Sequence, residues 1–244
     1  MNVYAERIGS GEKVIFIHGA GGNARSWFFQ KEYLKSLMEV ILIDLPGHGE
    51  DAEGTGCNTL AGYINYLREA IRELSIDKCY MIGHSMGGAI TMSFALSFPE
   101  LLKGIALITT GAKLKVFPEI LTGLQKDKEN AVRSIMDYAF SKKTPAALKE
   151  NGFKDMMKCK AEVIYGDFSA CEGFDLMDSV NRIKMPALII CGNDDILTPP
   201  RYSEYLHKQI EGSRLLNVEN AGHMVTLEKP KEVNKAINEW ITSC

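Results

Sequence analysis

A serine flanked by glycines is the residue of this chain best suited to act as a nucleophile. Ser85 lies in Gly-His-Ser-Met-Gly-Gly (residues 83–88), after the apolar run 79–82 and before the helix-like stretch 89–98. This is the Gly-x-Ser-x-Gly pattern of a tight strand-to-helix turn that exposes the serine hydroxyl. Glycines remove side chains that would clash there and tolerate the strained backbone. The pattern predicts nucleophilic chemistry through Ser85, with the Met86 N–H free to bind a developing oxyanion.

A serine nucleophile needs a neighbouring base, which is most often histidine. Among the five histidines, His223 follows the last apolar run, in a loop that can bring its imidazole to the serine. We therefore expect His223 to be the general base. The other four have different expected roles: His18 holds the glycine-rich loop after it, His48 lies in a turn, His84 points away from the serine, and His207 lies on a helix surface.

Two adjacent aspartates compete to orient that histidine. Where a serine occupies this kind of turn, the order along the chain is serine, acid, histidine. Asp194 and Asp195 follow the apolar run 187–191 and its glycine. We favour Asp195, which is expected where the strand end opens toward the histidine loop, while Asp194 is the alternative and is expected to cap the turn. The other position for such an acid, after the run 104–108, holds only Thr-Thr-Gly.

A glycine-rich loop is expected to complete the site. His-Gly-Ala-Gly-Gly-Asn (residues 18–23) follows an early apolar run, and we expect the N–H groups of Ala20 and Met86 to form an oxyanion hole. The loop lacks the Gly-Lys-Ser/Thr ending and the G-x-G-x-x-G spacing of nucleotide sites. No C-x-x-C pair or H-E-x-x-H motif indicates a metal. We expect neither a metal nor a cofactor.

Strand-like and helix-like segments alternate along the chain. The apolar runs are continuous rather than alternating, as in strands buried on both faces of a parallel sheet. Such alternation with helices predicts a doubly wound α/β sheet, with residues 3–8 as an antiparallel edge strand. The strands are expected at 14–17, 40–43, 79–82, 104–108, 187–191 and 214–218, and the helices at 26–37, 59–74, 86–98, 201–210 and 232–241.

One long segment interrupts this alternation. Residues 111–180 show no strong strand pattern, and helical patterns cover 117–124, 129–140 and 146–158. Because ligands bind at the carboxyl edge of such sheets, we interpret this segment as a helical cap over that edge. The domain organisation predicted is a core made of residues 1–110 and 181–244 with a cap at 111–180.

Composition excludes several classes of protein. The chain has 244 residues, is 45% hydrophobic and carries a net charge of −3, with both signs interspersed and no basic stripe for nucleic acid. No apolar run of about 20 residues predicts a membrane span, and the N-terminus lacks a secretory signal pattern. Six unpaired cysteines fit a reducing compartment, so we expect a cytoplasmic protein.

These motifs together resemble the α/β-hydrolase-fold serine hydrolases, in their carboxylesterase, lipase and lactonase branch. The resemblance extends over nearly the whole chain and includes Asp44–Gly49 (Asp-Leu-Pro-Gly-His-Gly) and Thr198-Pro199 beside the motifs above. It implies a mostly parallel sheet with a small helical cap inserted after the sixth strand. It also implies a catalytic triad of Ser85, Asp195 and His223, and an oxyanion hole of Ala20 and Met86.

The resemblance implies a serine carboxylesterase that hydrolyses small to medium esters through an acyl-enzyme. The expected partner is a small-molecule ester with an apolar acyl or alcohol part. The alternatives are an enol-lactone hydrolase or a carbon–carbon bond hydrolase of ring-cleavage products, whose cap would have to grip a carboxylate. Lys113, Lys115, Arg133, Lys142 and Lys143 are the candidates for that grip. A ligand-binding receptor or noncatalytic protein on the same scaffold is a further alternative, and the oligomeric state is not predicted.

Overall fold

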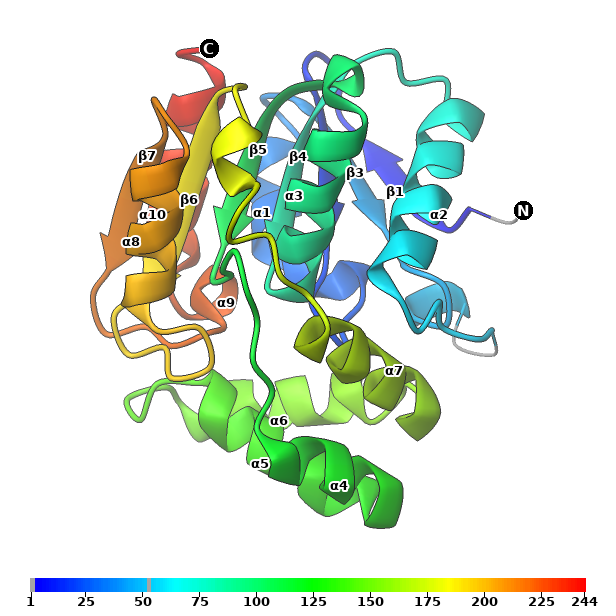
Figure 1. The fold of residues 1–244 in the computed structure, drawn as a ribbon. Helices are drawn as coiled ribbons and strands as arrows, with labels where there is room; N and C mark the ends of the chain where they lie inside the picture. Colours follow the sequence, from blue (N-terminus) through cyan, green and yellow to red (C-terminus); the bar gives the residue numbers. More distant parts are fainter. Residues whose placement is uncertain (1–2, 52–53) are drawn as a thin grey trace.

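The computed structural model describes residues 3–51 and 54–244 and contains a twisted seven-stranded sheet (Figure 1). The strand order is β1-β3-β2-β4-β5-β6-β7, with β1 antiparallel to β3 and the other pairs parallel. The expected antiparallel edge strand is therefore confirmed. The strands are β1 Ala5–Ile8, β2 Lys13–Ile17, β3 Glu39–Ile43, β4 Cys79–His84, β5 Leu102–Ile108, β6 Ala187–Gly192 and β7 Arg214–Val218.

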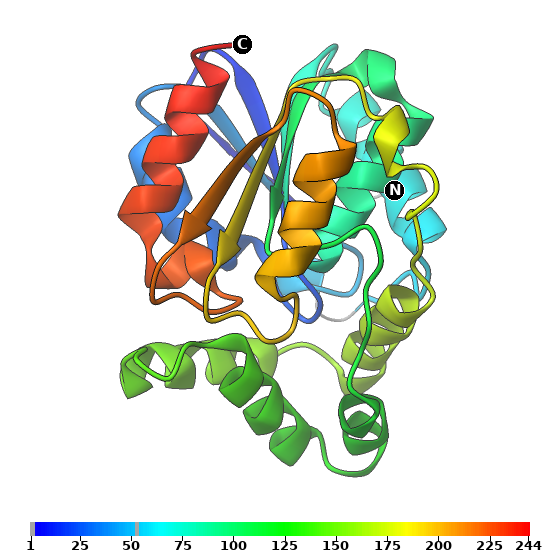
Figure 2. The same ribbon diagram turned by 60° about the vertical axis from the view of Figure 1, so that its left-hand side comes forward.

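Helices cover both faces of this sheet, as a doubly wound α/β fold requires (Figures 1 and 2). Alternate residues of β2 show why: Ile15 and Ile17 belong to one buried apolar cluster, Val14 and Phe16 to another. The first cluster packs under α2 Leu60–Glu73, α3 Met86–Ser97 and α8 Pro200–Gln209, and the second under α1 Phe28–Leu34, α9 Val225–Glu228 and α10 Pro230–Ile241. Short 3₁₀ helices occupy Ala24–Trp27, Gly49–Asp51, Pro99–Leu101 and Val180–Arg182.

The segment 111–180, called here the cap segment, lies across the carboxyl ends of the parallel strands (Figure 1). Its helices share an apolar cluster of their own, and Lys113 and Asp175 bridge the two chain segments that lead to and from them. It contains α4 Pro118–Lys126, α5 Lys128–Ala139, α6 Ala146–Met156 and α7 Ala161–Glu172. The division into core and cap at residues 111 and 180 stays a prediction.

The position of the insertion needs a correction. The cap segment follows β5, the fifth strand of the described chain, and not the sixth. The count differs by one strand at the N-terminal edge of the sheet. In the described residues β1 is both the first strand and the antiparallel edge strand, so only five strands come before the cap segment. All eight helices expected from the sequence are present, with ends shifted by at most three residues, whereas α7 and α9 were not expected.

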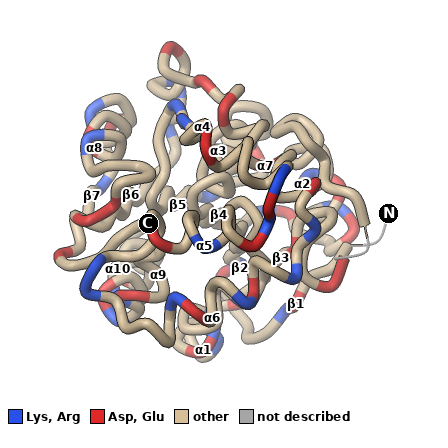
Figure 3. Tube along the Cα trace, turned by 90° about the horizontal axis from the view of Figure 1, so that it is seen from below, with Lys and Arg blue, Asp and Glu red and all other residues tan. Residues whose placement is uncertain are grey.

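Charged residues are distributed over the cap side of the molecule without segregation by sign (Figure 3). Within the described residues, no helix has both the length and the hydropathy that a bilayer crossing requires.

The turn between β4 and α3 is the tightest feature of the fold. Ser85 has φ 54° and ψ −117°, in a region that L residues rarely adopt. A Cβ on Gly83 would lie 2.1 Å from the Gly87 carbonyl oxygen, and a Cβ on Gly87 would lie 2.3 Å from the carbonyl oxygen of Ile17. The glycines are therefore needed because α3 approaches the sheet backbone without room for side chains.

We expect Gly87→Ala to destabilise the protein by at least about 3 kcal/mol, because the new methyl group meets a carbonyl that belongs to the sheet. Gly173→Ala is the matched control, since its Cβ would find its nearest neighbour 3.8 Å away. Denaturant unfolding followed by circular dichroism measures both. Equal stability of the two variants would contradict the close-packing explanation.

Candidate active site

Ser85 lies at the end of β4, where α3 begins. Its N–H donates to the Ile108 carbonyl at 2.9 Å, and its own carbonyl accepts the Thr110 hydroxyl at 2.9 Å. These bonds to β5 and the residues after it anchor the backbone on both sides of the side chain. The Met86 N–H opens α3, where unpaired N–H groups and the helix dipole favour negative charge.

His223 and Asp195 form a buried pair beside this serine. The His223 Nδ1 is 2.9 Å from Asp195 Oδ2, so Nε2 is left as the basic nitrogen of the ring. Asp195 Oδ1 accepts the N–H groups of Leu197 and Thr198, each at 2.9 Å, and Oδ2 accepts the Thr198 hydroxyl at 2.7 Å. Burial acts to raise the pKa of Asp195, but the charge of His223 and these hydrogen bonds outweigh it and lower the pKa. The carboxylate is thus held ionised and oriented.

Asp194 faces the cap segment. Its Oδ2 accepts the Ser141 hydroxyl at 2.6 Å, and its N–H donates to the Ala221 carbonyl at 2.8 Å. Of the two competing aspartates, the structure therefore pairs Asp195 with His223 and Asp194 with Ser141.

The backbone of His223 is held by groups to which sequence reasoning assigned no role. Its carbonyl accepts His84 Nε2–H at 2.9 Å and the Thr109 hydroxyl at 3.0 Å. Burial, followed by the charge of His223, lowers the pKa of His84 to about 3, so His84 is a neutral donor. Its ring packs against the His223 ring with centroids 4.9 Å apart. The sequence shows that His84 is next to Ser85, but it gives no sign that His84 contacts a loop 139 residues away along the chain.

The glycine-rich loop closes against the serine. The Gly22 N–H donates to the Gly19 carbonyl at 3.0 Å, which makes a tight turn of residues 19–22. A Cβ on Gly19 would lie 3.2 Å from the Ser85 Cβ, so this turn and the serine are in close contact. As expected, His18 holds the loop: Nδ1 donates to the Gly19 carbonyl at 2.8 Å, and Nε2 accepts the Leu45 N–H at 3.1 Å. Burial lowers the pKa of His18 well below its usual value, which fits a neutral ring in both roles.

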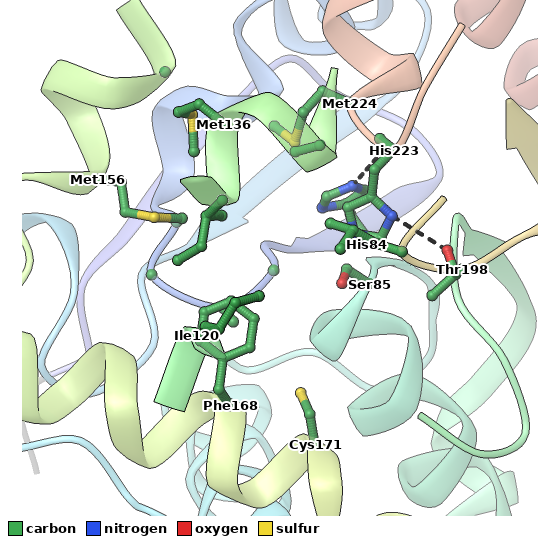
Figure 4. Close-up of a pocket in the computed structure, with 18 of the residues that line it drawn as sticks. His84, Ser85, Ile120, Met136, Met156, Phe168, Cys171, Thr198, His223 and Met224 are labelled. Carbon is green, nitrogen blue, oxygen red and sulfur yellow. Dashed lines mark hydrogen bonds between the residues drawn. The ribbon is translucent and has the colours of Figure 1, made fainter. Parts of the chain in front are cut away.

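Ser85, His223 and residues 19–22 line one cavity of about 110 Å³ between the sheet edge and the cap segment (Figure 4). Its walls are mainly apolar, with thioether and aromatic side chains from the cap segment. The apolar lining includes Leu114, Val116, Phe117, Ile120, Ile135, Met136, Ala139, Met156, Phe168, Leu197 and Met224. Among the described residues, no group of three or more His, Cys, Asp or Glu side chains is arranged to hold a metal ion.

Comparison with known proteins agrees with this architecture. Residues 14–236 match the model of the alpha/beta hydrolase family, and the chain belongs to that family. It is 27% identical to the (E)-2-((N-methylformamido)methylene)succinate hydrolase of Acinetobacter baylyi, over 96% of this chain and 91% of that protein. Both the fold and the relatives support a hydrolase.

Solved structures give the same result. A thermophilic esterase superposes with a TM-score of 0.86 at 32% identity, covering 98% of each chain. The enol-lactonase of Burkholderia xenovorans LB400 superposes with a TM-score of 0.92 at 20% identity, covering 98% of this chain and 96% of that chain. The second likeness supports the fold alone.

The two aspartates can be separated by mutation. We expect Asp195→Asn to lower hydrolytic turnover by about 10⁴-fold, because the amide cannot hold the histidine in the required tautomer. Asp194→Asn is the matched control and should lower turnover less than about tenfold, since it changes only a contact with the cap segment. Initial rates at saturating substrate measure both, and the reverse ranking would contradict the pairing of Asp195 with His223.

Proposed function

We propose that this protein is a serine carboxylesterase that hydrolyses small to medium carboxylic esters through an acyl-enzyme. The observation that carries the proposal is the meeting of three elements in one apolar cavity. These are a serine on a strained turn, a histidine paired with a buried carboxylate, and the tight turn of residues 19–22, which lies against the serine. This is the constellation required for acyl transfer from an ester to water.

The proposed reaction has two halves. His223 Nε2 takes the proton of the Ser85 hydroxyl while the oxygen attacks the ester carbonyl, and the N–H groups of Ala20 and Met86 bind the oxyanion. His223 then gives its proton to the leaving alkoxide, and the acyl group stays on Ser85. A water deprotonated by His223 attacks the acyl-enzyme, the carboxylic acid leaves, and the serine recovers its proton. Asp195 stabilises the imidazolium in both halves.

The cavity favours an ester with a short apolar acyl part. Its volume is somewhat smaller than an apolar cavity of about 150 Å³ that admits benzene.

A ring-cleavage product or an enol-lactone with a free carboxylate would need a cation in the cavity to bind that carboxylate. Among the described residues that line the cavity, Lys115 is the one lysine or arginine. Lys113, Arg133 and Lys143 bond to oxygen atoms outside it. Lys115, as a cation at the cavity that could hold such a carboxylate, supports lactone hydrolysis as the second candidate.

The test is hydrolysis of p-nitrophenyl esters of increasing acyl length. We expect turnover by the wild type to fall by at least about 10⁴-fold in Ser85→Ala, because the nucleophile is lost. Circular dichroism must show that the variant is folded. Ester hydrolysis that persists in pure, folded Ser85→Ala would contradict the role of Ser85, and a folded wild type that turns over lactones but no esters would favour the second candidate.

The acyl preference should respond to the cavity wall. We expect Phe168→Ala to raise the kcat/KM ratio of octanoate to butyrate esters roughly tenfold, because the space gained would bury about two of the extra methylenes, each of which contributes about 0.8 kcal/mol. Phe153→Ala is the matched control: Phe153 packs in the same apolar cluster of the cap segment but does not line the cavity. A similar shift in both variants would mean that the cap segment loosens as a whole and that Phe168 does not limit chain length.

A further inference from the structure

A buried carboxylate behind the cavity has no part in the proposed reaction. Asp167 lies on α7 of the cap segment and is fully buried. It accepts three hydrogen bonds from three separate parts of the core: the Gly21 N–H at 2.8 Å, the Tyr63 hydroxyl at 2.5 Å, and His48 Nε2 at 2.8 Å. Asp167 is absent from the cavity wall, so its function must be exerted through one of these partners.

The charge of Asp167 is balanced inside the protein. Burial acts to lower the pKa of His48, but its hydrogen bonds to Asp167 and Cys159 and the charge of the Asp167 carboxylate outweigh burial and raise the pKa to about 10. Isolated buried charges are costly, and even a paired one is weak evidence of a stabilising role. Apolar side chains could pack α7 against the core equally well. The presence of a carboxylate at position 167 therefore needs a reason other than packing.

The contact with Gly21 supplies that explanation. In the turn of residues 19–22, Gly21 is the third residue and has φ +61°, whereas Ala20 has a negative φ. This combination is typical of a type II turn, in which the central peptide between Ala20 and Gly21 is rotated relative to a type I turn. The rotation decides which way the Gly21 N–H points. Because Asp167 accepts that N–H from the cap side, its carboxylate selects one of the two orientations.

The same turn carries the proposed oxyanion donor. The peptides that carry the N–H groups of Ala20 and Gly21 are joined at the Ala20 Cα, so a bond that anchors the Gly21 peptide to α7 also limits how far the Ala20 peptide can tilt or shift. Side chains of the cap segment also surround this turn: a Cβ on Gly21 would lie 3.2 Å from Met156 atoms and 3.3 Å from Ile164. Contacts with the cap segment therefore help to define the local geometry of the turn around Gly21.

We infer that Asp167 is a positioning residue for the oxyanion hole. Through its bond to Gly21, Asp167 couples the docking of α7 to the orientation of the Ala20 N–H. Asp167 touches neither substrate nor Ser85, and it acts through the Ala20–Gly21 peptide. The inference rests on the proposed esterase function, since an oxyanion must form for the orientation to matter.

The test compares two inhibitors of equal shape. A trifluoromethyl ketone adds to the serine and forms a tetrahedral oxyanion, whereas the matching methyl ketone binds mainly as a ground-state carbonyl. We expect Asp167→Ala to lower the ratio of their affinities by at least about tenfold, and kcat to fall with little change in KM, because one oxyanion donor is misplaced. The fluorine NMR signal of the tetrahedral adduct reports the same loss directly.

The matched control removes a different bond of the same carboxylate. Tyr63→Phe deletes the hydrogen bond to Asp167 Oδ1 but leaves the bond between Oδ2 and the Gly21 N–H. We expect it to lower stability while the affinity ratio stays within about twofold of wild type. Asp167→Asn, which keeps an acceptor oxygen, should recover most of the ratio. A structural role alone would change the ratio equally in Asp167→Ala and Tyr63→Phe, and that result would overturn the inference.

Failure of the positioning role can be distinguished from failure of the proposed esterase function. If Asp167→Ala does not fold, Asp167→Cys, which is close in volume but a poor acceptor, replaces it with the same expected loss. An unchanged affinity ratio in a folded variant without the acceptor overturns the positioning role while leaving the esterase proposal intact. A wild type that forms no adduct and hydrolyses no ester overturns the proposed function, and this inference with it.

Discussion

The contact between α3 and the backbone of β2 is the constraint on which the site depends. Gly87 lies so close to the Ile17 carbonyl that no side chain fits between them, and Ser85 takes a strained backbone conformation as a result. Such strain costs of the order of 1–3 kcal/mol and persists only where the surroundings enforce it. Here β2, β4 and β5 enforce it, and the same contact brings the turn of residues 19–22 against the serine.

Four buried histidines lie around this turn and the serine, and they differ in their hydrogen-bond partners. His18 and His84 hydrogen-bond to backbone groups. Burial lowers the pKa of both, so both rings are neutral and hold the backbone through these bonds. His48 and His223 each face a buried aspartate. One carboxylate–histidine pair comes from the β6–α8 and β7–α9 loops, and the other comes from α7 and the β3–α2 connection. The His223–Asp195 pair is suited to proton transfer, whereas the His48–Asp167 pair binds the backbone N–H of Gly21.

The cap segment contributes more than a cover. It supplies most of the apolar wall of the cavity, and it bonds to both loops that flank the serine. Ser141 donates to Asp194, and Glu228 of the core accepts the N–H groups of Gly222 and Ser141, at 2.9 and 3.0 Å, beside His223. Asp167 of the cap segment accepts the Gly21 N–H in the turn of residues 19–22. The apolar wall of the cavity and the loops beside Ser85 are therefore held by the same segment.

The sequence by itself determined the parts of this protein that depend on local order along the chain. Continuous apolar runs give the parallel strands, and Ser85, Asp195 and His223 could be selected because each follows a strand whose carboxyl end reaches the same sheet edge. Only the tertiary structure decided which side chains meet. The contact of His84 with His223 spans 139 residues, and that of Asp167 with Gly21 spans 146. Helix α7 was not expected because it buries a glycine and an aspartate where a helix normally buries apolar residues. Those residues satisfy partners in the core, and no local pattern records such partners.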